Sequence, residues 1–369
     1  IMKKQTKLAA VFLIIIAVMA FSACGAPEET GEEQVPYEIA LISDTKSIED
    51  GAFNEAVWNG IESFVEEDPV SYKHYMTTED STRAYLKAIE EASKGGAKLV
   101  IAAGSAFSNA IERAQDQYPE LHFLLLDGQP CEEDGTPSQC GDNTVSIQFS
   151  EEQAGYLAGY AAVKEGYRNL AFLGGKEQPP VQRFGYGYVQ GAHAAAEELG
   201  ASDLKVRYAY LDTFEESDKV EELAEDWYSD GTEVIFACAG AAGRSVMRAA
   251  EACGGNVIGA DVDQSRESET VLVSAVKNIE AAVSDVLWEY YGDQEFAGGQ
   301  SVLLDAENAG IGLSMESSRM KHFGKSEYEE VFQKLAKKTV VVKKDEVQNP
   351  EQMGTKRVEV QFVKELETD

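Results

Sequence analysis

Three loops of the sequence hold residue types that could bind a flat, hydroxylated ligand. The first, residues 43–54, offers the carboxylates of Asp44 and Asp50, the ring of Phe53 and the amide of Asn54. Carboxylates accept hydrogen bonds from hydroxyl and ring N–H groups, and an aromatic face stacks on a base. This loop therefore predicts a nucleobase or sugar site. An alternative interpretation is structural, with Asp50 and Asn54 as helix caps and Phe53 as a core anchor.

The other two loops are residues 239–243, which hold two glycines among alanines, and residues 259–264, which combine Gly259 with Asp261 and Asp263. Gly240 allows a ligand to approach the backbone closely, and the helix that follows begins with free N–H groups. The loop lacks the Gly-Lys-Ser/Thr ending of a phosphate-binding loop. Asp261 and Asp263 alternate along the chain, so we expect one to face inward and the other solvent rather than both to bind a metal ion.

No set of residues predicts catalysis or a metal site. The Gly-x-Ser-x-Gly motif is absent, and we interpret Ser105 as part of a ligand-facing loop after a strand,. The four histidines are scattered and lack the spacing of metal ligands,. We therefore expect no catalytic residue, no metal and no cofactor.

The cysteines fall into two groups. Cys131 and Cys140 flank a polar loop and could either close a disulfide or stay free,. Cys238 and Cys253 have apolar or small neighbours, which predicts that both lie in the core.

Short apolar runs that alternate with amphipathic stretches must position these loops. This alternation is typical of βαβ units, which build α/β folds with parallel sheets. Two series with the same rhythm predict two doubly wound lobes of parallel sheet with helices on both faces. The predicted strands are Ile39–Ser43, Ser71–Met76, Leu99–Ala103 and His122–Asp127 in the first series, and Leu170–Gly174, Leu204–Tyr210, Val234–Cys238 and Val257–Ala260 in the second.

The C-terminal section is too short for a third domain, and we expect it to cross back between the lobes. Residues 37–149 with about 277–305 would form the N-terminal lobe, and residues 150–276 with about 306–369 the C-terminal lobe. The elements predicted there are strands Val271–Val276 and Val302–Leu304, helices Asn278–Tyr291 and Tyr328–Lys337, and the apolar segments Thr339–Val342 and Val358–Val363.

The first 24 residues have the pattern of an export signal. Three lysines precede an apolar run from Leu8 to Phe21, which is typical of a secretory signal and short for a membrane span,. The sequence Phe21-Ser22-Ala23-Cys24 resembles a bacterial lipobox. We therefore predict a signal peptide at 1–23, a diacylglycerol on Cys24 and an acidic linker at 24–36; two acyl chains anchor a protein stably. An uncleaved anchor is the alternative.

The net charge of the chain is −33. A body this acidic repels phosphate backbones and anionic headgroups, so we expect no nucleic-acid partner and no lipid-surface partner beyond the anchor itself.

Six short motifs occur in order along the chain: Asp50-Gly51-Ala52-Phe53-Asn54; Tyr118-Pro119-Glu120 with Phe123 and Asp127; Ala154-Gly155-Tyr156-Leu157-Ala158-Gly159; Gly174-Gly175 with Pro180-Val181 and Phe184-Gly185-Tyr186; Ile258-Gly259-Ala260-Asp261-Val262-Asp263-Gln264; and Val271-Leu272-Val273-Ser274-Ala275-Val276-Lys277. From about Ile39 to Leu313 the chain thereby resembles the basic membrane protein family of solute-binding lipoproteins. The best-understood type of this family is the purine nucleoside receptor of ABC transporters. The first loop here lacks the glycine pair usual in the family.

The resemblance implies a type I periplasmic-binding-protein fold with the ligand in the cleft between two lobes. Two aromatic residues would sandwich the purine, and they fall on Phe53 and Phe214. Asp44 would hydrogen-bond to the purine base, and Asn54 and the loop Ser105–Phe107 would complete the part of the site that surrounds the base.

The ribose end is implied in the same way. The residues expected to hold the ribose hydroxyls are Gly240, Asp261 and Lys277, with Asp263 as the competing aspartate. Asp127 lies at the adjacent strand end and is a further candidate.

The resemblance implies a monomeric, lipid-anchored receptor on the extracytoplasmic face of the cell membrane, which presents a purine nucleoside to ABC permease subunits. A sugar-binding protein and a sensory or regulatory relative are alternatives with the same fold. A nucleoside-cleaving enzyme would also need carboxylates and stacking aromatics. Asp44 and Asp50 lack the further clustered aspartates that a calcium site of such an enzyme needs, and we expect no enzyme.

Overall fold

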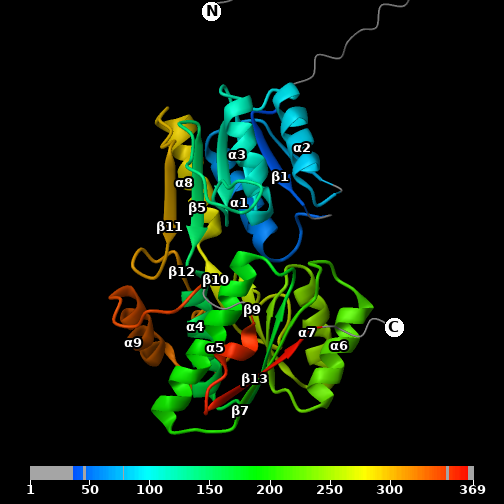
Figure 1. Ribbon diagram of the computed structural model, residues 1–369, viewed down its shortest axis with the longest axis vertical. Helices are drawn as coiled ribbons and strands as arrows, with labels where there is room; N and C mark the ends of the chain where they lie inside the picture. The colour runs from blue at the N-terminus through cyan, green and yellow to red at the C-terminus, as the bar shows by residue number, and fades with distance from the viewer. Residues whose placement is uncertain (1–35, 45–46, 78, 346–348, 365–369) are drawn as a thin grey trace, which may run out of the picture. The chain divides into compact units, whose positions relative to one another are not determined.

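The computed structural model describes residues 36–44, 47–77, 79–345 and 349–364. The predicted signal peptide and lipidated Cys24 lie outside the described residues. Within them the chain builds two sheets (Figure 1). We call the part around the first sheet the first lobe and the part around the second sheet the second lobe.

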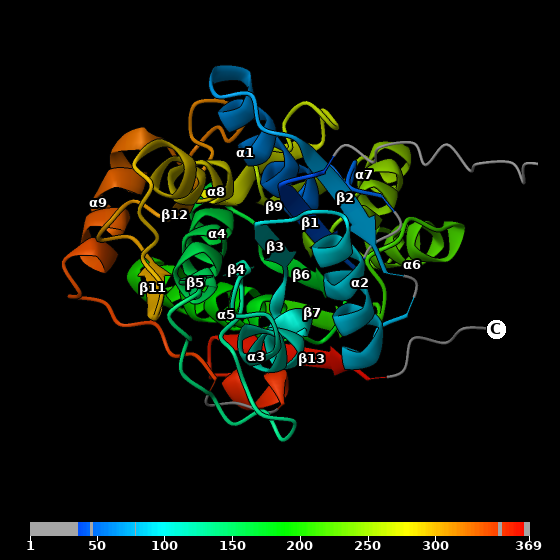
Figure 2. The same cartoon turned by 90° about the horizontal axis from the view of Figure 1, so that it is seen from above.

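The first sheet is entirely parallel, with strand order β11-β5-β4-β3-β1-β2. Helices α2 and α3 cover one face, and α1 and α8 cover the other (Figure 2). Because both faces are covered, strands β1 and β3 are buried along their whole length,. The elements of this lobe are β1 (Ile39–Ser43), α1 (Phe53–Glu67), β2 (Tyr72–Met76), α2 (Thr82–Lys94), β3 (Leu99–Ala103), a 3₁₀ turn η1 (Ser105–Phe107), α3 (Ser108–Gln117), β4 (His122–Leu126), β5 (Thr144–Phe149), α8 (Ile279–Leu287), a π-helical turn η2 (Trp288–Gly292) and β11 (Gln300–Leu304).

The second sheet has the order β12-β10-β9-β8-β6-β7-β13 and is parallel except for the antiparallel pair of β10 and β12. Helices α4 and α5 pack on one face, and α6 and α7 on the other. The elements are α4 (Glu151–Glu165), β6 (Asn169–Gly174), α5 (Pro179–Leu199), β7 (Leu204–Tyr210), α6 (Asp218–Ser229), β8 (Val234–Cys238), α7 (Ala242–Cys253), β9 (Asn256–Asp261), β10 (Val271–Lys277), β12 (Ile311–Leu313), α9 (Lys325–Ala336), a 3₁₀ turn η3 (Pro350–Met353) and β13 (Val358–Val363).

Glycines in both α4 and α5 let these two helices approach each other closely. A Cβ on Gly155 would lie 2.0 Å from the carbonyl oxygen of Phe184, and one on Gly191 would lie 1.9 Å from that of Tyr156. The backbones of α4 and α5 therefore touch directly. This close packing fixes the start of α5, which faces the pocket described below.

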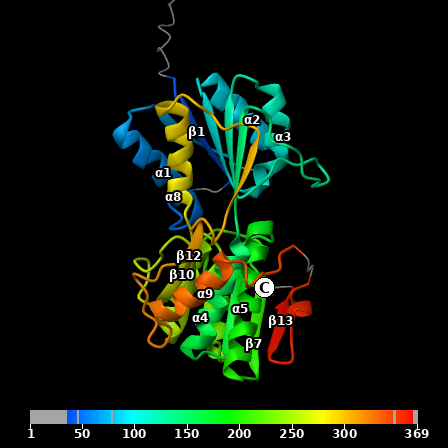
Figure 3. The same ribbon diagram turned by 90° about the vertical axis from the view of Figure 1, so that its left-hand side faces the viewer.

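The chain passes between the lobes more than once. After β10 it adds α8, which lies beside α1, and β11, which extends the first sheet next to β5 (Figure 3). It then returns to the second sheet through β12. The α/β class with parallel sheets flanked by helices is confirmed.

Several local predictions were wrong. The three-residue strand β12 was not predicted, and of the two apolar segments expected at the end of the chain Val358–Val363 forms β13 whereas Thr339–Val342 forms no strand. The predicted helix Asn278–Tyr291 ends at Leu287 and continues as the π-helical turn η2.

The cysteines also differ from expectation. Cys253 is exposed at the end of α7, whereas Cys238 is buried as predicted. Cys131 and Cys140 are both free thiols in the structure, which selects the second of the two alternatives left open by the sequence.

Candidate ligand-binding site

The main pocket lies where the carboxyl ends of both sheets meet, which is the usual ligand position in open α/β folds,. The empty space within it is about 840 Å³, counting solvent at its open side. Both lobes contribute walls. Nine of the residues predicted from the sequence line it: Asp44, Phe53, Asn54, Ser105, Asp127, Phe214, Gly240, Asp261 and Lys277.

A buried cluster of charges joins the two lobes at the inner end of the pocket. The Nζ atom of Lys277, at the end of β10, lies 2.6 Å from Oδ2 of Asp127 and 3.0 Å from Oδ1 of Asp261. Asp127 follows β4 of the first lobe, whereas Asp261 ends β9 of the second. The side chain of Lys277 is only 1% exposed. A cation this deeply buried needs charged partners, and the two aspartates supply them.

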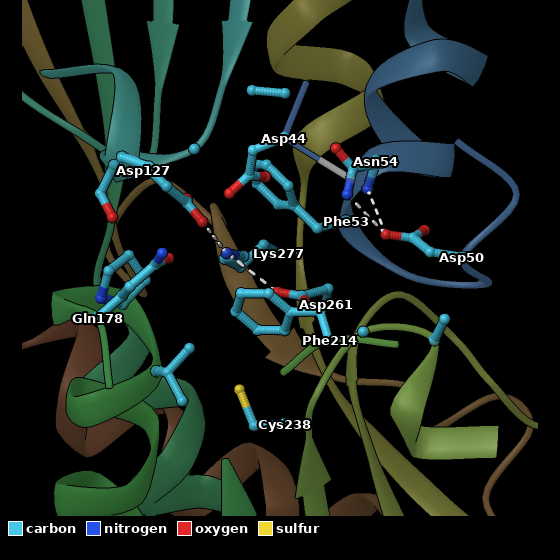
Figure 4. Close-up of a pocket in the computed structure, with 18 of the residues that line it drawn as sticks. Asp44, Asp50, Phe53, Asn54, Asp127, Gln178, Phe214, Cys238, Asp261 and Lys277 are labelled. Atoms are coloured by element: carbon cyan, nitrogen blue, oxygen red, sulfur yellow. Dashed lines mark hydrogen bonds and ion pairs between the residues drawn. The ribbon is translucent and has the colours of Figure 1, made fainter. Parts of the chain in front are cut away.

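The backbone turns both aspartates toward this lysine. Asp127 has φ 57° and Asp261 has φ 68°, so both strands end in the left-handed region. Aspartate tolerates this region better than most residues, and such conformations concentrate at functional sites. The turn brings each carboxylate from its strand end to Lys277, as Figure 4 shows.

Glu151, the first residue of α4, is a member of this cluster that the sequence did not reveal. It is fully buried, with Oε1 4.0 Å from Nζ of Lys277 and Oε2 3.8 Å from Arg183. Burial, together with the charge of Asp127, raises the pKa of Glu151 to about 8. The shift favours the protonated form of Glu151, and a neutral Glu151 relieves the excess of negative charge around Lys277.

Burial also shifts the pKa values of Asp127 and Lys277. Burial raises the pKa of Asp127, and the charge of Lys277 opposes this shift. Burial alone would lower the pKa of Lys277, but Asp127, Asp261 and Glu151 together raise it. The second oxygen of Asp127, Oδ1, is buried and has no hydrogen-bond partner among the described residues. Buried oxygens are normally satisfied, so this pocket-lining atom can accept a hydrogen bond from a ligand hydroxyl.

Two aromatic rings, one from each lobe, line the same pocket. Phe53 is the first residue of α1, and Phe214 lies in the loop between β7 and α6. Nζ of Lys277 lies 4.7 Å from the ring centre of Phe53. A Cβ on Gly175 would lie 2.2 Å from the ring of Phe214, so only glycine allows the ring its observed position. Each ring is thus an apolar, aromatic part of the pocket wall.

Asp50 and Asn54 are buried beside Phe53, where Asp50 fixes the start of α1. Asp50 accepts hydrogen bonds from backbone N–H groups at the helix start, as the capping interpretation predicted. Phe53 nevertheless lines the pocket while also packing on the core, so the structural and ligand-binding interpretations of this loop are compatible.

Asp44 lies at the end of β1, opposite a cation from the second lobe. Nζ of Lys176 lies 3.7 Å from Oδ2 of Asp44 and 2.8 Å from Oδ2 of Asp80. Burial raises the pKa of Asp44, and Lys176 opposes this shift. Lys176 was not predicted, although it follows β6 and the rule of strand carboxyl ends would have found it.

Two predicted residues lie outside the pocket. Phe107 is fully buried between α2 and α3, with its ring centre 4.2 Å from that of Tyr85, because η1 turns its side chain into the core. Asp263 is exposed and accepts hydrogen bonds from the Ser317 hydroxyl at 2.6 Å and the Ser265 N–H at 3.0 Å. Of the alternating aspartates, Asp261 therefore faces inward and Asp263 outward.

Other pocket residues were missed. Gln178, Pro180 and Val181 at the start of α5 follow β6 and could have been found by their position after a strand. Glu215 follows β7 directly after the predicted Phe214 and could have been found in the same way, whereas Phe184 lies inside α5 and gave no such signal. In the described part of the chain, no group of three His, Cys, Asp or Glu side chains is arranged to hold a metal ion. No helix among the described residues has the length and apolar character to cross a membrane.

Two lobes of parallel sheet with a polar and aromatic pocket at their strand ends define a solute-binding protein of the type I periplasmic-binding class. The family described as "ABC transporter substrate-binding protein PnrA-like" (Bmp) matches residues 38–349. The chain belongs to this family, and the resemblance inferred from the six motifs is confirmed.

Individual relatives agree with this assignment. The ABC transporter nucleoside-binding protein BmpA of Lactococcus lactis is 27% identical over 340 residues, covering 86% of this chain and 92% of the relative. Basic membrane protein A of Borreliella burgdorferi is 26% identical over 334 residues, which cover 89% of this chain and 94% of the relative. An ABC transporter solute-binding protein from Aeropyrum pernix K1 superposes with a TM-score of 0.72 at 20% sequence identity. The superposition covers 84% of this chain and 95% of that protein, which thus shares the fold.

Proposed function

We propose that this substrate-binding protein captures a purine nucleoside between its lobes and delivers it to the permease of an ABC transporter. The observation that carries the proposal is the pairing, in one pocket, of two aromatic rings with a buried Lys277 cluster. A nucleoside has a flat base and a hydroxylated sugar, and these two kinds of group match the two ends of the pocket. The name of the relative BmpA supports the same ligand class.

The sugar would lie at the Lys277 cluster. The free Oδ1 of Asp127 and the carboxylate of Asp261 can accept from vicinal hydroxyls, and the ammonium of Lys277 can donate to a hydroxyl or ring oxygen,. Gly240 has φ 54°, so its loop turns where only glycine is unstrained, and its backbone is open to the sugar,. The base would stack on Phe53 and Phe214, with Asp44, Asn54 and Ser105 around its edge.

Contacts between the lobes would close the protein over its ligand. Arg244 donates to the carbonyl of Glu49 at 2.9 Å, and Gln264 donates to the carbonyl of Gly51 at 2.9 Å. Both donors belong to the second lobe and both acceptors to the loop before α1. Closure thereby links the second lobe to the segment that positions Phe53 and Asn54.

The proposal also covers location. A lipid anchor on Cys24 would hold the protein at the extracytoplasmic face of the cell membrane as a monomer beside its permease. The Cys24→Ala variant should lose incorporation of labelled fatty acid and leave the membrane fraction or stay unprocessed. Label that still marks the variant would remove the anchor from the proposal.

A thermal-shift panel of nucleosides, free bases and sugars on the purified protein tests the ligand class. A ligand at 100 times its dissociation constant adds about 2.7 kcal/mol to the stability, which a melting curve detects easily. We expect purine nucleosides to raise the melting temperature and free sugars to leave it unchanged. Stabilisation by a sugar alone would favour the sugar-binding alternative, and chelator-sensitive cleavage of inosine would favour an enzyme.

A further inference from the structure

The orientation of the Asn54 amide is fixed by Asp50. Oδ1 of Asp50 accepts from the backbone N–H groups of Ala52 at 2.9 Å and Glu55 at 3.1 Å. Its Oδ2 accepts from the backbone N–H of Asn54 at 3.0 Å and from the side-chain Nδ2 of Asn54 at 2.9 Å. A carboxylate that caps a helix in this way can only accept, so the NH₂ group of Asn54 must face it.

The amide oxygen of Asn54 is consequently left for the pocket. Asn54 lines the pocket, and its Oδ1 is buried without a hydrogen-bond partner among the described residues. Figure 4 shows this oxygen on the side of the amide that points away from Asp50. The side chain therefore offers the ligand the acceptor Oδ1, while Asp50 binds one of the two N–H donors of Nδ2 and holds the amino group on its own side,.

Asp44 offers a second acceptor on the same wall of the pocket. Its side chain is 12% exposed, and the ammonium of Lys176, 3.7 Å away, favours its charged form. Asp80 is the other charged group facing this lysine and carboxylate; it accepts from Lys176 at 2.8 Å and from the Tyr85 hydroxyl at 2.5 Å. The hydroxyl of Ser105 can donate or accept and so does not discriminate.

A base edge that meets two acceptors must carry donors. Guanine presents N1–H beside its N2 amino group, and hypoxanthine presents N1–H alone. Adenine carries its N6 amino donor beside the bare N1, so one acceptor of the pocket can be satisfied, whereas the other would face the acceptor N1 in a buried site. Resting on the proposed nucleoside function, we infer that the pocket selects 6-oxopurine nucleosides, guanosine before inosine and both before adenosine, with Asp50 as the positioning residue that fixes the Asn54 amide.

Calorimetry of the full chain with guanosine, inosine, adenosine and 1-methylguanosine tests the inference. We expect guanosine to bind at least about 10-fold more tightly than adenosine, the ratio expected for one buried group left unpaired. Methylation at N1 should remove most of this advantage. Binding of adenosine as tight as guanosine would overturn the inference but leave the nucleoside function standing, whereas no binding of any nucleoside would overturn both.

Two variants assign the preference to residues. Asp44→Asn adds a donor at the base edge and should reduce the ratio of the affinity for guanosine to that for adenosine. Asp263→Asn is a matched change at an exposed carboxylate outside the pocket and should leave this affinity ratio unchanged. Asp50→Asn can still cap the helix but no longer fixes the amide, so it should narrow the ratio too. If Asp44→Asn and a folded Asp50→Asn both kept the affinity ratio of the parent protein, Asp44 and Asp50 would not be the residues that set the preference for guanosine.

Discussion

Lys176 of the second lobe donates to Asp80 of the first lobe across 2.8 Å, beside the open side of the pocket. The two side chains are 26% and 53% exposed, so the pair is screened by solvent and contributes modestly. In the closure proposed above, the pair would form only when the lobes come together, and it would therefore stabilise the closed form in particular. The pair should therefore affect the dissociation rate of the ligand more than its association rate.

Asp80→Asn should accelerate ligand dissociation by about 1.5- to 5-fold, corresponding to an exposed pair worth about 0.2–1 kcal/mol. The association rate should stay unchanged because the open form lacks this contact. Stopped-flow fluorescence with a bound nucleoside measures both rates. Asp230→Asn is the matched control, since Asp230 pairs with Arg207 within the second lobe at similar exposure. Equal dissociation rates for the two variants would contradict the role in closure.

Gly175→Ala should weaken nucleoside binding by displacing the ring of Phe214. A Cβ there would meet the ring at 2.2 Å, and stacking on an aromatic contributes about 1–3 kcal/mol, or roughly 5- to 150-fold in affinity,. Calorimetry on Gly175→Ala and Phe214→Ala should give similar losses. Gly243→Ala is the control, because its added Cβ would lie 4.0 Å from the nearest atom. Parent-like binding by Phe214→Ala would remove this ring from the site.

Glu151 should make the folded state less stable as the pH rises. Its pKa is about 8 in the folded protein against an ordinary value of 4.5. Between these values the folded state holds more protons than the unfolded state, so the free energy of unfolding should fall with pH by at most about 1.4 kcal/mol per pH unit. Asp127, Lys277, Arg183 and Glu152 are the charged groups around it.

Urea denaturation of the parent and Glu151→Gln from pH 5 to 9 measures this effect. The variant is neutral at every pH, so its stability should fall less steeply between pH 5 and 8. The exposed Glu120→Gln controls for the loss of a carboxylate elsewhere. If Glu151→Gln kept the full slope of the parent, Glu151 would not be the group that titrates.

The fold could be predicted largely from the sequence because strands covered on both faces are continuous apolar runs. Strands such as Leu99–Ala103 and Val234–Cys238 stand out locally for this reason,. The strand β12 does not stand out in the sequence, because its three residues form a strand only by pairing with β10. Leu313 of β12, for example, pairs with Ala275 of β10. Residues Thr339–Val342 show the reverse case, an apolar segment for which the described structure offers no partner strand.

The pocket could be predicted in part for a similar reason. Loops after strands are visible in the sequence, and the loops with Asp44, Phe53 and Asp261 line the pocket. Lys176 could have been found by its position after β6, but its pairing with Asp80 and the burial of Glu151 depend on partners far away in the chain and carry no local signal. Phe107 shows the limit of the loop argument, because a single turn of 3₁₀ helix was enough to direct its ring into the core.

A ribonucleoside should bind more tightly than its 2′-deoxy form. The Lys277 cluster holds carboxylate oxygens of Asp127 and Asp261 at the pocket, and Oδ1 of Asp127 has no partner among the described residues. A ligand that lacks one hydroxyl leaves a buried acceptor unsatisfied, which costs about 1–3 kcal/mol, or roughly 5- to 150-fold in affinity. Calorimetry on guanosine and 2′-deoxyguanosine measures the difference.

The variants Asp261→Asn and Asp263→Asn show which carboxylate is responsible. Both changes remove one negative charge and keep the side-chain volume, but Asp261 faces Lys277 at 3.0 Å whereas Asp263 is exposed and bonded to Ser317. We expect Asp261→Asn to erase the preference for the ribonucleoside, because an amide can satisfy fewer hydroxyl donors than a carboxylate. Asp263→Asn should retain the preference. Equal affinity of the parent for both ligands would place the sugar away from Asp261, and loss of the preference in Asp263→Asn alone would move the ribose site to the outer aspartate.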